Sequence, residues 1–193
     1  GLSPKSITHD SLDVLKAHIQ NLADRESKEL EYKLKLILKD QDQQKIVNDI
    51  NSFRKTNIGA MLDQMYGRFP LEVFLDDFLT PLLKLVGQLW AAGSLSIEAE
   101  HFFSQVVQEK LILYEKDFVP KKDKGGLLLT TPPGELHCLG LLMANLKFLN
   151  QGYNVYCLGT QTPIFNVAQI AKKEGLKIVG IGVSEAFPIS KAQ

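Results

Sequence analysis

The feature of this chain that most constrains its fold is a change in the spacing of apolar residues near residue 125. Before that point, apolar side chains recur every three to four residues, which is the period of helices packed on one another. After it, short apolar runs alternate with helical patterns, which predicts a parallel sheet with crossover helices. We expect strands at residues 126–131, 153–158 and 177–183, and helices at residues 139–150 and 164–174.

The two patterns divide the chain at a polar linker, residues 120–126. Residues 25–119 are predicted to form a helical bundle of the four-helix type. Residues 125–193 are predicted to form a Rossmann-like, flavodoxin-like parallel-sheet domain. Because a full sheet of that kind has about two further strand–helix units, we expect this domain to be incomplete.

Within the bundle, the pattern from residue 71 to residue 92 predicts the longest helix. Pro81 lies inside it and should kink it or displace a turn, because proline has no backbone N–H. Ser96 is expected to cap the following helix, which begins at Ile97.

Charge and composition exclude several functions. Lys and Arg together number 22, as do Asp and Glu, so the net charge is zero and the chain alone lacks the basic footprint of a DNA binder. No apolar run reaches the roughly 20 residues of a membrane span. The two cysteines, Cys138 and Cys157, form no disulfide framework, which favours the cytoplasm. No nucleophile–base pair or phosphate loop is evident, so we do not expect an enzyme.

The main candidate site is the loop at residues 130–140, where an expected strand passes into an expected helix. In open parallel sheets, ligands bind at the carboxyl ends of strands. Glu135 precedes His137 by two residues and can accept a hydrogen bond from one imidazole nitrogen, which leaves the other nitrogen for a metal. Gly140 lets the backbone approach a bulky ligand. The alternative is a loop histidine that bonds only to its neighbours.

Two motifs carry a family resemblance. Glu135-x-His137-x-x-Gly140 resembles the cobalt-ligating loop of cobalamin-binding Rossmann-like domains. Its lead-in, Thr-Thr-Pro-Pro-Gly, is similar to that of MerR-type, cobalamin-binding, light-responsive transcription regulators (the CarH-like family). The second hallmark of that family is Trp90, nine further residues and then Glu100-His101.

The resemblance implies cobalamin bound with its own base displaced, with His137 as the lower cobalt ligand and the helical bundle over the upper face. Adenosylcobalamin is the expected form, with methylcobalamin or hydroxocobalamin as alternatives. The upper face would be closed by Trp90, Glu100 and His101. The next loop would line the ring edge through Leu158, Gly159, Thr160 and Thr162, and the nucleotide tail would meet the element Gly182-Val183-Ser184.

The resemblance also has implications for assembly. Residues 1–24 resemble the last helical segment of a MerR-type DNA-binding head, so DNA would be bound only through an absent N-terminal domain. The alternative is that this stretch is an ordinary amphipathic helix. A homo-oligomer, either a dimer or a tetramer, is the expected assembly.

The chain departs from the family at two positions. Ala91 stands where light-responsive members carry the histidine that captures cobalt after illumination, which puts light sensing by that route in doubt. Gly182 stands where a serine often continues the hydrogen-bond chain from the ligand histidine, so either Glu135 orients His137 with less help or Ser184 substitutes.

Three functions therefore remain open. The leading hypothesis is the sensory module of a cobalamin-dependent transcription regulator. The second is the corrinoid-carrying subunit of a cobalamin-dependent methyltransferase, and the third is an interaction module that binds no cobalamin.

Overall fold

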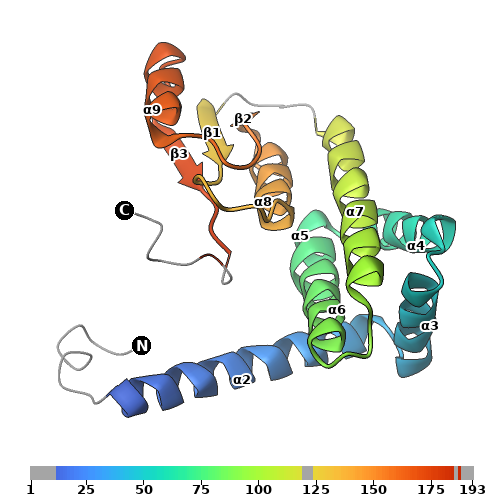
Figure 1. Cartoon of the computed structure of the whole chain (residues 1–193). Helices are drawn as coiled ribbons and strands as arrows, with labels where there is room; N and C mark the ends of the chain where they lie inside the picture. The colour runs from blue at the N-terminus through green and yellow to red at the C-terminus, as the bar shows by residue number, and fades with distance from the viewer. Residues whose placement is uncertain (1–11, 119–123, 185–186, 188–193) are drawn as a thin grey trace.

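The computed structural model describes residues 12–118, 124–184 and 187, and it confirms the predicted fold class: a helical part followed by a three-stranded parallel sheet with helices (Figure 1). Most of the predicted linker and the two ends of the chain lie outside the described residues. The helical part contains α2 (Leu12–Ile37), α3 (Asp40–Asn51), α4 (Lys55–Arg68), α5 (Leu71–Val73), η1 (Phe74–Leu79), α6 (Thr80–Ala91), α7 (Ile97–Tyr114) and η2 (Glu115–Asp117). The second part contains β1 (Gly126–Thr130), α8 (Leu139–Asn150), β2 (Asn154–Cys157), α9 (Ile164–Lys173) and β3 (Ile178–Ile181).

The sheet has the order β2-β1-β3, and both pairings are parallel. β1 is central because its apolar run is long enough to be buried on both faces, and Leu127 and Leu128 are fully buried. Leu128 pairs with Tyr156 on one side and with Val179 on the other. All three strands end at the same edge, so the loops that follow them lie together. The predicted strands and helices of this part are confirmed to within two residues at each end.

The helical part has its own apolar core, which is centred on aromatic rings from several helices. Phe74, Phe78 and Phe103 have no exposed surface. Tyr66 stacks on Tyr114 with ring centroids 3.8 Å apart, and the Tyr114 hydroxyl donates a hydrogen bond of 2.9 Å to Asp63 Oδ1. This core holds the helices that face the sheet in a fixed arrangement.

The predicted helix at residues 71–92 is interrupted, as the position of Pro81 requires. Residues Phe74–Leu79 form a π-helical segment, η1, directly before the proline. The wider turn accommodates Pro81, which cannot donate a backbone hydrogen bond. The Thr80 hydroxyl, Oγ1, donates a hydrogen bond of 2.8 Å to the backbone oxygen of Leu75. The prediction that this is the longest helix is wrong, because α2 has 26 residues. The predicted cap is confirmed, since Ser96 Oγ accepts 3.2 Å from Ala99 N.

Helix α2 continues through residues 24 and 25, where the sequence suggests a boundary between a tail and the bundle. No glycine or proline occurs in residues 23–29 to end it. The carboxyl half of α2 packs into the bundle core through Leu34, and Leu38, the first residue after the helix, packs into the same core. The tail and the bundle, as separate domains, stay a prediction. None of the described helices is long and apolar enough to cross a lipid bilayer.

Helix α8 joins the two parts of the molecule. One side packs on the sheet through Leu141, and the other reaches the helical core through Leu146. Three polar side chains of α8 add contacts to the helical part: Asn145 to Glu115 at 2.6 Å, Lys147 to Asp76 at 2.5 Å and Asn150 to Glu72 at 2.9 Å. Helix α8 thus contacts both the sheet and the helical part.

Candidate functional site

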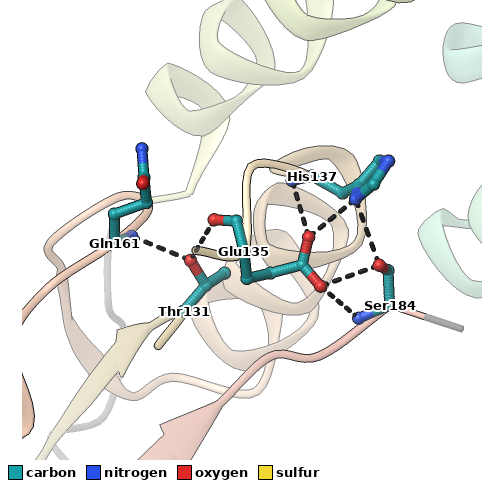
Figure 2. Close-up of polar contacts among 5 residues, drawn as sticks. All are labelled: Thr131, Glu135, His137, Gln161 and Ser184. Carbon is teal, nitrogen blue, oxygen red and sulfur yellow. Dashed lines mark hydrogen bonds and ion pairs between the residues drawn. The ribbon is translucent and has the colours of Figure 1, made fainter. Parts of the chain in front are cut away.

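Glu135, His137 and Ser184 meet at the carboxyl ends of β1 and β3 (Figure 2). Glu135 Oε1 accepts a hydrogen bond from the backbone N–H of His137 (2.9 Å) and lies 2.6 Å from ring atom Nδ1. Its other oxygen, Oε2, accepts from both the backbone N–H and the hydroxyl of Ser184, each at 2.7 Å. One carboxylate thus fixes the histidine and the end of a neighbouring strand.

The ionisation of Glu135 follows from these contacts. Burial of the side chain, which is 1% exposed, would raise its pKa. The hydrogen bonds from His137 and Ser184 outweigh burial and lower the pKa to about 2, so the group is anionic at neutral pH. An anionic carboxylate beside Nδ1 favours the tautomer with its proton on Nδ1. The lone pair of Nε2 is then free for a ligand, on a side chain that is 64% exposed.

The local backbone explains how the loop presents His137. Gly134 has φ of 88°, a left-handed conformation that glycine adopts without steric cost. The Glu135 N–H donates 3.1 Å to Pro132 O, which closes a turn. Cys138 then precedes the first residue of α8, so the histidine stands between the turn and the helix.

His137 opens into a pocket of about 640 Å³ that both parts of the molecule line. Its wall is mainly apolar, with charged side chains at intervals. A Cβ added at Gly140 would meet no heavy atom within 4 Å, so any side chain there would extend into open space at the pocket wall. The lining residues are Glu26, Leu30, Thr80, Leu83, Lys84, His137, Gly140, Met143, Ala144, Lys147 and Ser184.

This site suits a metal that arrives already held in a ring. The described residues contain no cluster of three or more His, Cys, Asp or Glu side chains that would enclose a bare ion. An imidazole nitrogen is a good ligand for cobalt and related metals, and a carboxylate on its other nitrogen is the usual support. If a macrocyclic metal complex bound here, His137 would supply one nitrogen ligand through Nε2 and the apolar wall would contact the ring.

The second predicted motif lies at the junction of α6 and α7. Trp90 is 49% exposed in the last turn of α6. It follows Leu83 by seven residues, which places it on the same side of the helix as that pocket residue. Glu100 and His101 lie in the first turns of α7. Neither they nor Trp90 is among the residues that line the pocket, so their contact with a ligand stays a prediction.

The carboxylate of Glu100 holds His101 much as Glu135 holds His137. Glu100 Oε2 lies 2.6 Å from Nδ1 of His101, and Oε1 accepts 2.6 Å from Ser104 Oγ. The imidazole of His101 is 72% exposed, and its Nε2 points away from this pair of bonds. The chain therefore presents two oriented histidines, one from each part.

The remaining predicted residues occupy the loop after β2 and the end of β3. The predicted ring-edge residues lie next to the His137 loop, because Leu158 N donates to Leu129 O (2.9 Å) and Thr162 N donates to Thr131 O (3.1 Å). Gly159 and Thr160 lie between them in the chain. At the end of β3, Gly182 N donates 2.8 Å to Thr130 O, and Ser184 two residues later reaches Glu135, as the substitution hypothesis requires.

The sequence did not indicate the α2 contribution to the pocket, from Glu26 and Leu30, or the role of Met143. No local motif marks these residues, because their place in the pocket depends on how α2 and α8 pack. Thr131 and Gln161 were also missed as partners in the hydrogen-bond network of Figure 2.

Comparison with known proteins points to corrinoid chemistry. Residues 30–115, which form most of the helical part, match the family described as "B12 binding domain". The chain is 30% identical over 112 residues to the HTH-type transcriptional repressor CarH of Myxococcus xanthus, covering 58% of this chain and 37% of that protein. It is 25% identical over 171 residues to methionine synthase of Mycobacterium leprae, covering 84% of this chain and 14% of that protein. The chain thus spans well under half the length of these relatives.

The fold has a counterpart among solved structures. It superposes on the Methanosarcina barkeri monomethylamine corrinoid protein with a TM-score of 0.57 and 16% identity, covering 71% of this chain and 66% of that one. At this identity the likeness concerns the fold alone. Residues 30–115 therefore carry the match to the B12 binding domain family, and the chain shares the fold of that corrinoid protein over 71% of its own length.

Proposed function

We propose that this chain binds cobalamin with the cofactor's own base displaced and with Nε2 of His137 as the lower ligand of cobalt. The observation that carries the proposal is the hydrogen bonding of His137. An ionised, buried carboxylate holds Nδ1 at 2.6 Å and leaves Nε2 at the mouth of a large pocket. Lys84 and Lys147 add two cationic side chains to the lining of this pocket.

Within that proposal, the chain serves as the sensory module of a transcription regulator and not as an enzyme. The similarity to the CarH repressor and the motif of Trp90, Glu100 and His101 support this role. Adenosylcobalamin is the proposed natural form of the cofactor. The proposed response to it is self-association of the chain, and DNA would be bound by a separate domain.

The second candidate is a corrinoid carrier that passes methyl groups to a methyltransferase. The match to methionine synthase favours it, because that match covers more of this chain than the match to the repressor does. A methyl-transfer assay with the methylcobalamin-loaded chain and a corrinoid methyltransferase separates the two. A carrier transfers methyl groups catalytically. A sensor does not, and its oligomeric state in gel filtration changes with the upper ligand.

Trp90→Ala is expected to weaken binding of adenosylcobalamin about tenfold, with little effect on hydroxocobalamin. Trp90 follows the pocket residue Leu83 by seven residues, so an indole on that side of α6 would contact a large upper group and not a small one. Titration of the variant and of the unaltered chain with both cobalamins measures the difference. Equal losses for the two forms would show that Trp90 only packs against protein.

Ala91 determines what we expect from illumination. Light cleaves the bond between cobalt and an adenosyl group, a lability that belongs to the cofactor. Ala91 offers no ligand atom, so the illuminated complex should show one histidine ligand, and Ala91→His should add a second. Absorption spectra before and after light test this. A spectrum with two histidines from the unaltered chain, lost in His101→Ala, would instead assign the second ligand to the oriented imidazole of His101.

A further inference from the structure

Two loops meet near His137, and the buried hydroxyl of Thr131 is bonded to both of them (Figure 2). Thr131 is 1% exposed. Its Oγ1 donates a hydrogen bond of 3.0 Å to the backbone oxygen of Glu135 and accepts one of 2.9 Å from the backbone N–H of Gln161. The hydroxyl thus donates a hydrogen bond to the loop that carries His137 and accepts one from the loop after β2.

The backbone of Thr131 makes two further bonds to the same neighbouring loop. Its N–H donates 3.3 Å to Gly159 O, and its carbonyl accepts 3.1 Å from Thr162 N. Residues 159–162 are therefore held at three points by one threonine. Because Glu135 in turn fixes Nδ1 of His137, a displacement of either loop is passed to the imidazole.

Gln161 shows that this arrangement is specific. Its φ is 62°, a left-handed conformation that is unfavourable for a residue with a side chain. Strain of this kind persists only where surrounding contacts maintain it. In this conformation the Gln161 N–H is directed at Thr131 Oγ1, which compensates part of the cost.

We infer that Thr131 is a positioning residue for the cobalt ligand. It joins the loop of residues 158–163, predicted to meet the ring edge, to the loop that carries His137, so that both hold the corrin as one rigid unit. The inference rests on the proposed cobalamin function. It adds a residue that touches neither ring nor metal and acts through Glu135.

The neighbouring Thr130 provides a matched control. It is also fully buried, and its Oγ1 lies 2.9 Å from Gly159 O and 2.7 Å from Thr162 Oγ1. It makes the same kind of contact with the second loop and also lies 3.3 Å from Thr131 O, but among the described residues it has no hydrogen bond to Glu135. Thr130→Val and Thr131→Val remove one buried hydroxyl each and differ in whether a hydrogen bond to Glu135 is lost.

The experiment titrates the purified variants with hydroxocobalamin and records the fraction with a histidine-bound spectrum, alongside the melting temperature without cofactor. Loss of a group that supports a ligand costs about 10–100-fold in metal affinity, and Thr131 acts one bond further away. We therefore expect about tenfold weaker binding and a reduced histidine-bound fraction for Thr131→Val. Thr131→Ser, which retains the hydroxyl, should restore both, and Thr130→Val should lower the melting temperature and weaken binding less than Thr131→Val does.

If Thr131→Val does not fold, Thr131→Ala replaces it in the same titration, because the smaller alanine side chain cannot clash with its neighbours. Unaltered binding in a hydroxyl-free variant, or an equal loss in Thr130→Val, overturns the inference. The proposed function fails differently, through the absence of a histidine-bound spectrum in the unaltered chain.

Discussion

His137→Ala is expected to abolish the histidine-bound spectrum of cobalamin and to weaken its binding by more than about 100-fold. Loss of a supporting group alone costs about 10–100-fold, and here the ligand itself is removed. Glu135 would also lose its partner at Nδ1 and keep its hydrogen bonds from Ser184 and from the backbone N–H at position 137. Absorption titration with hydroxocobalamin measures both the spectrum and the affinity.

The matched control is His18→Ala, which removes an imidazole from α2 at a position that does not line the His137 pocket. Binding by this variant should equal that of the unaltered chain. Imidazole added to His137→Ala should restore nitrogen ligation, because it supplies the missing group in the space that the side chain leaves. An unchanged spectrum in His137→Ala would mean that another nitrogen binds cobalt.

Phe78→Ala should lower the free energy of unfolding by about 3–5 kcal/mol, which is the usual cost of removing a buried aromatic ring. Phe78 has no exposed surface and lies in the π-helical segment that precedes Pro81. Since domains of this size are stable by about 5–15 kcal/mol, the loss is a large share of the total. Urea unfolding followed by circular dichroism gives the value.

Leu36→Ala is the control for that measurement, because Leu36 is 68% exposed on α2. We expect a change of about 0.5 kcal/mol or less. A similar small change for Phe78→Ala would show that the core can close around the missing ring, or that the π-helical segment is not packed as described.

The fold of the sheet domain was predictable because its signals are local. The run Leu127 to Leu129 between glycine and threonine indicates a buried strand. The loop after it contains prolines and Gly134, which are typical of turns, and the polar pair Glu135 and His137. The link between Glu135 and His137 spans two residues, so the motif alone predicts it. The periodic spacing of the helices was equally clear, and Ser96 marked a helix start correctly.

The parts that could not be predicted depend on contacts between distant residues. Thr131 and Gln161 are 30 positions apart, and the pairing of β1 with β2 brings them together. The pocket wall formed by Leu30 of α2 depends on how an entire helix packs. The π-helical segment was hidden because one extra residue in a turn hardly changes an apolar pattern. Light response and the contacts of Trp90 with a ligand stay predictions.

The most direct test of the central claim is electron paramagnetic resonance of reduced, divalent cobalt in cobalamin bound to this chain, with histidine labelled by the heavy isotope of nitrogen. An axial nitrogen splits each cobalt line, and ordinary nitrogen gives triplets whereas the heavy isotope gives doublets. Labelling histidine in the protein, and not the cofactor, should convert triplets to doublets, and His137→Ala should remove the splitting from histidine. Triplets that persist after histidine is fully labelled would show that the nitrogen on cobalt belongs to the cofactor's own base or to another type of residue, and would contradict ligation by His137.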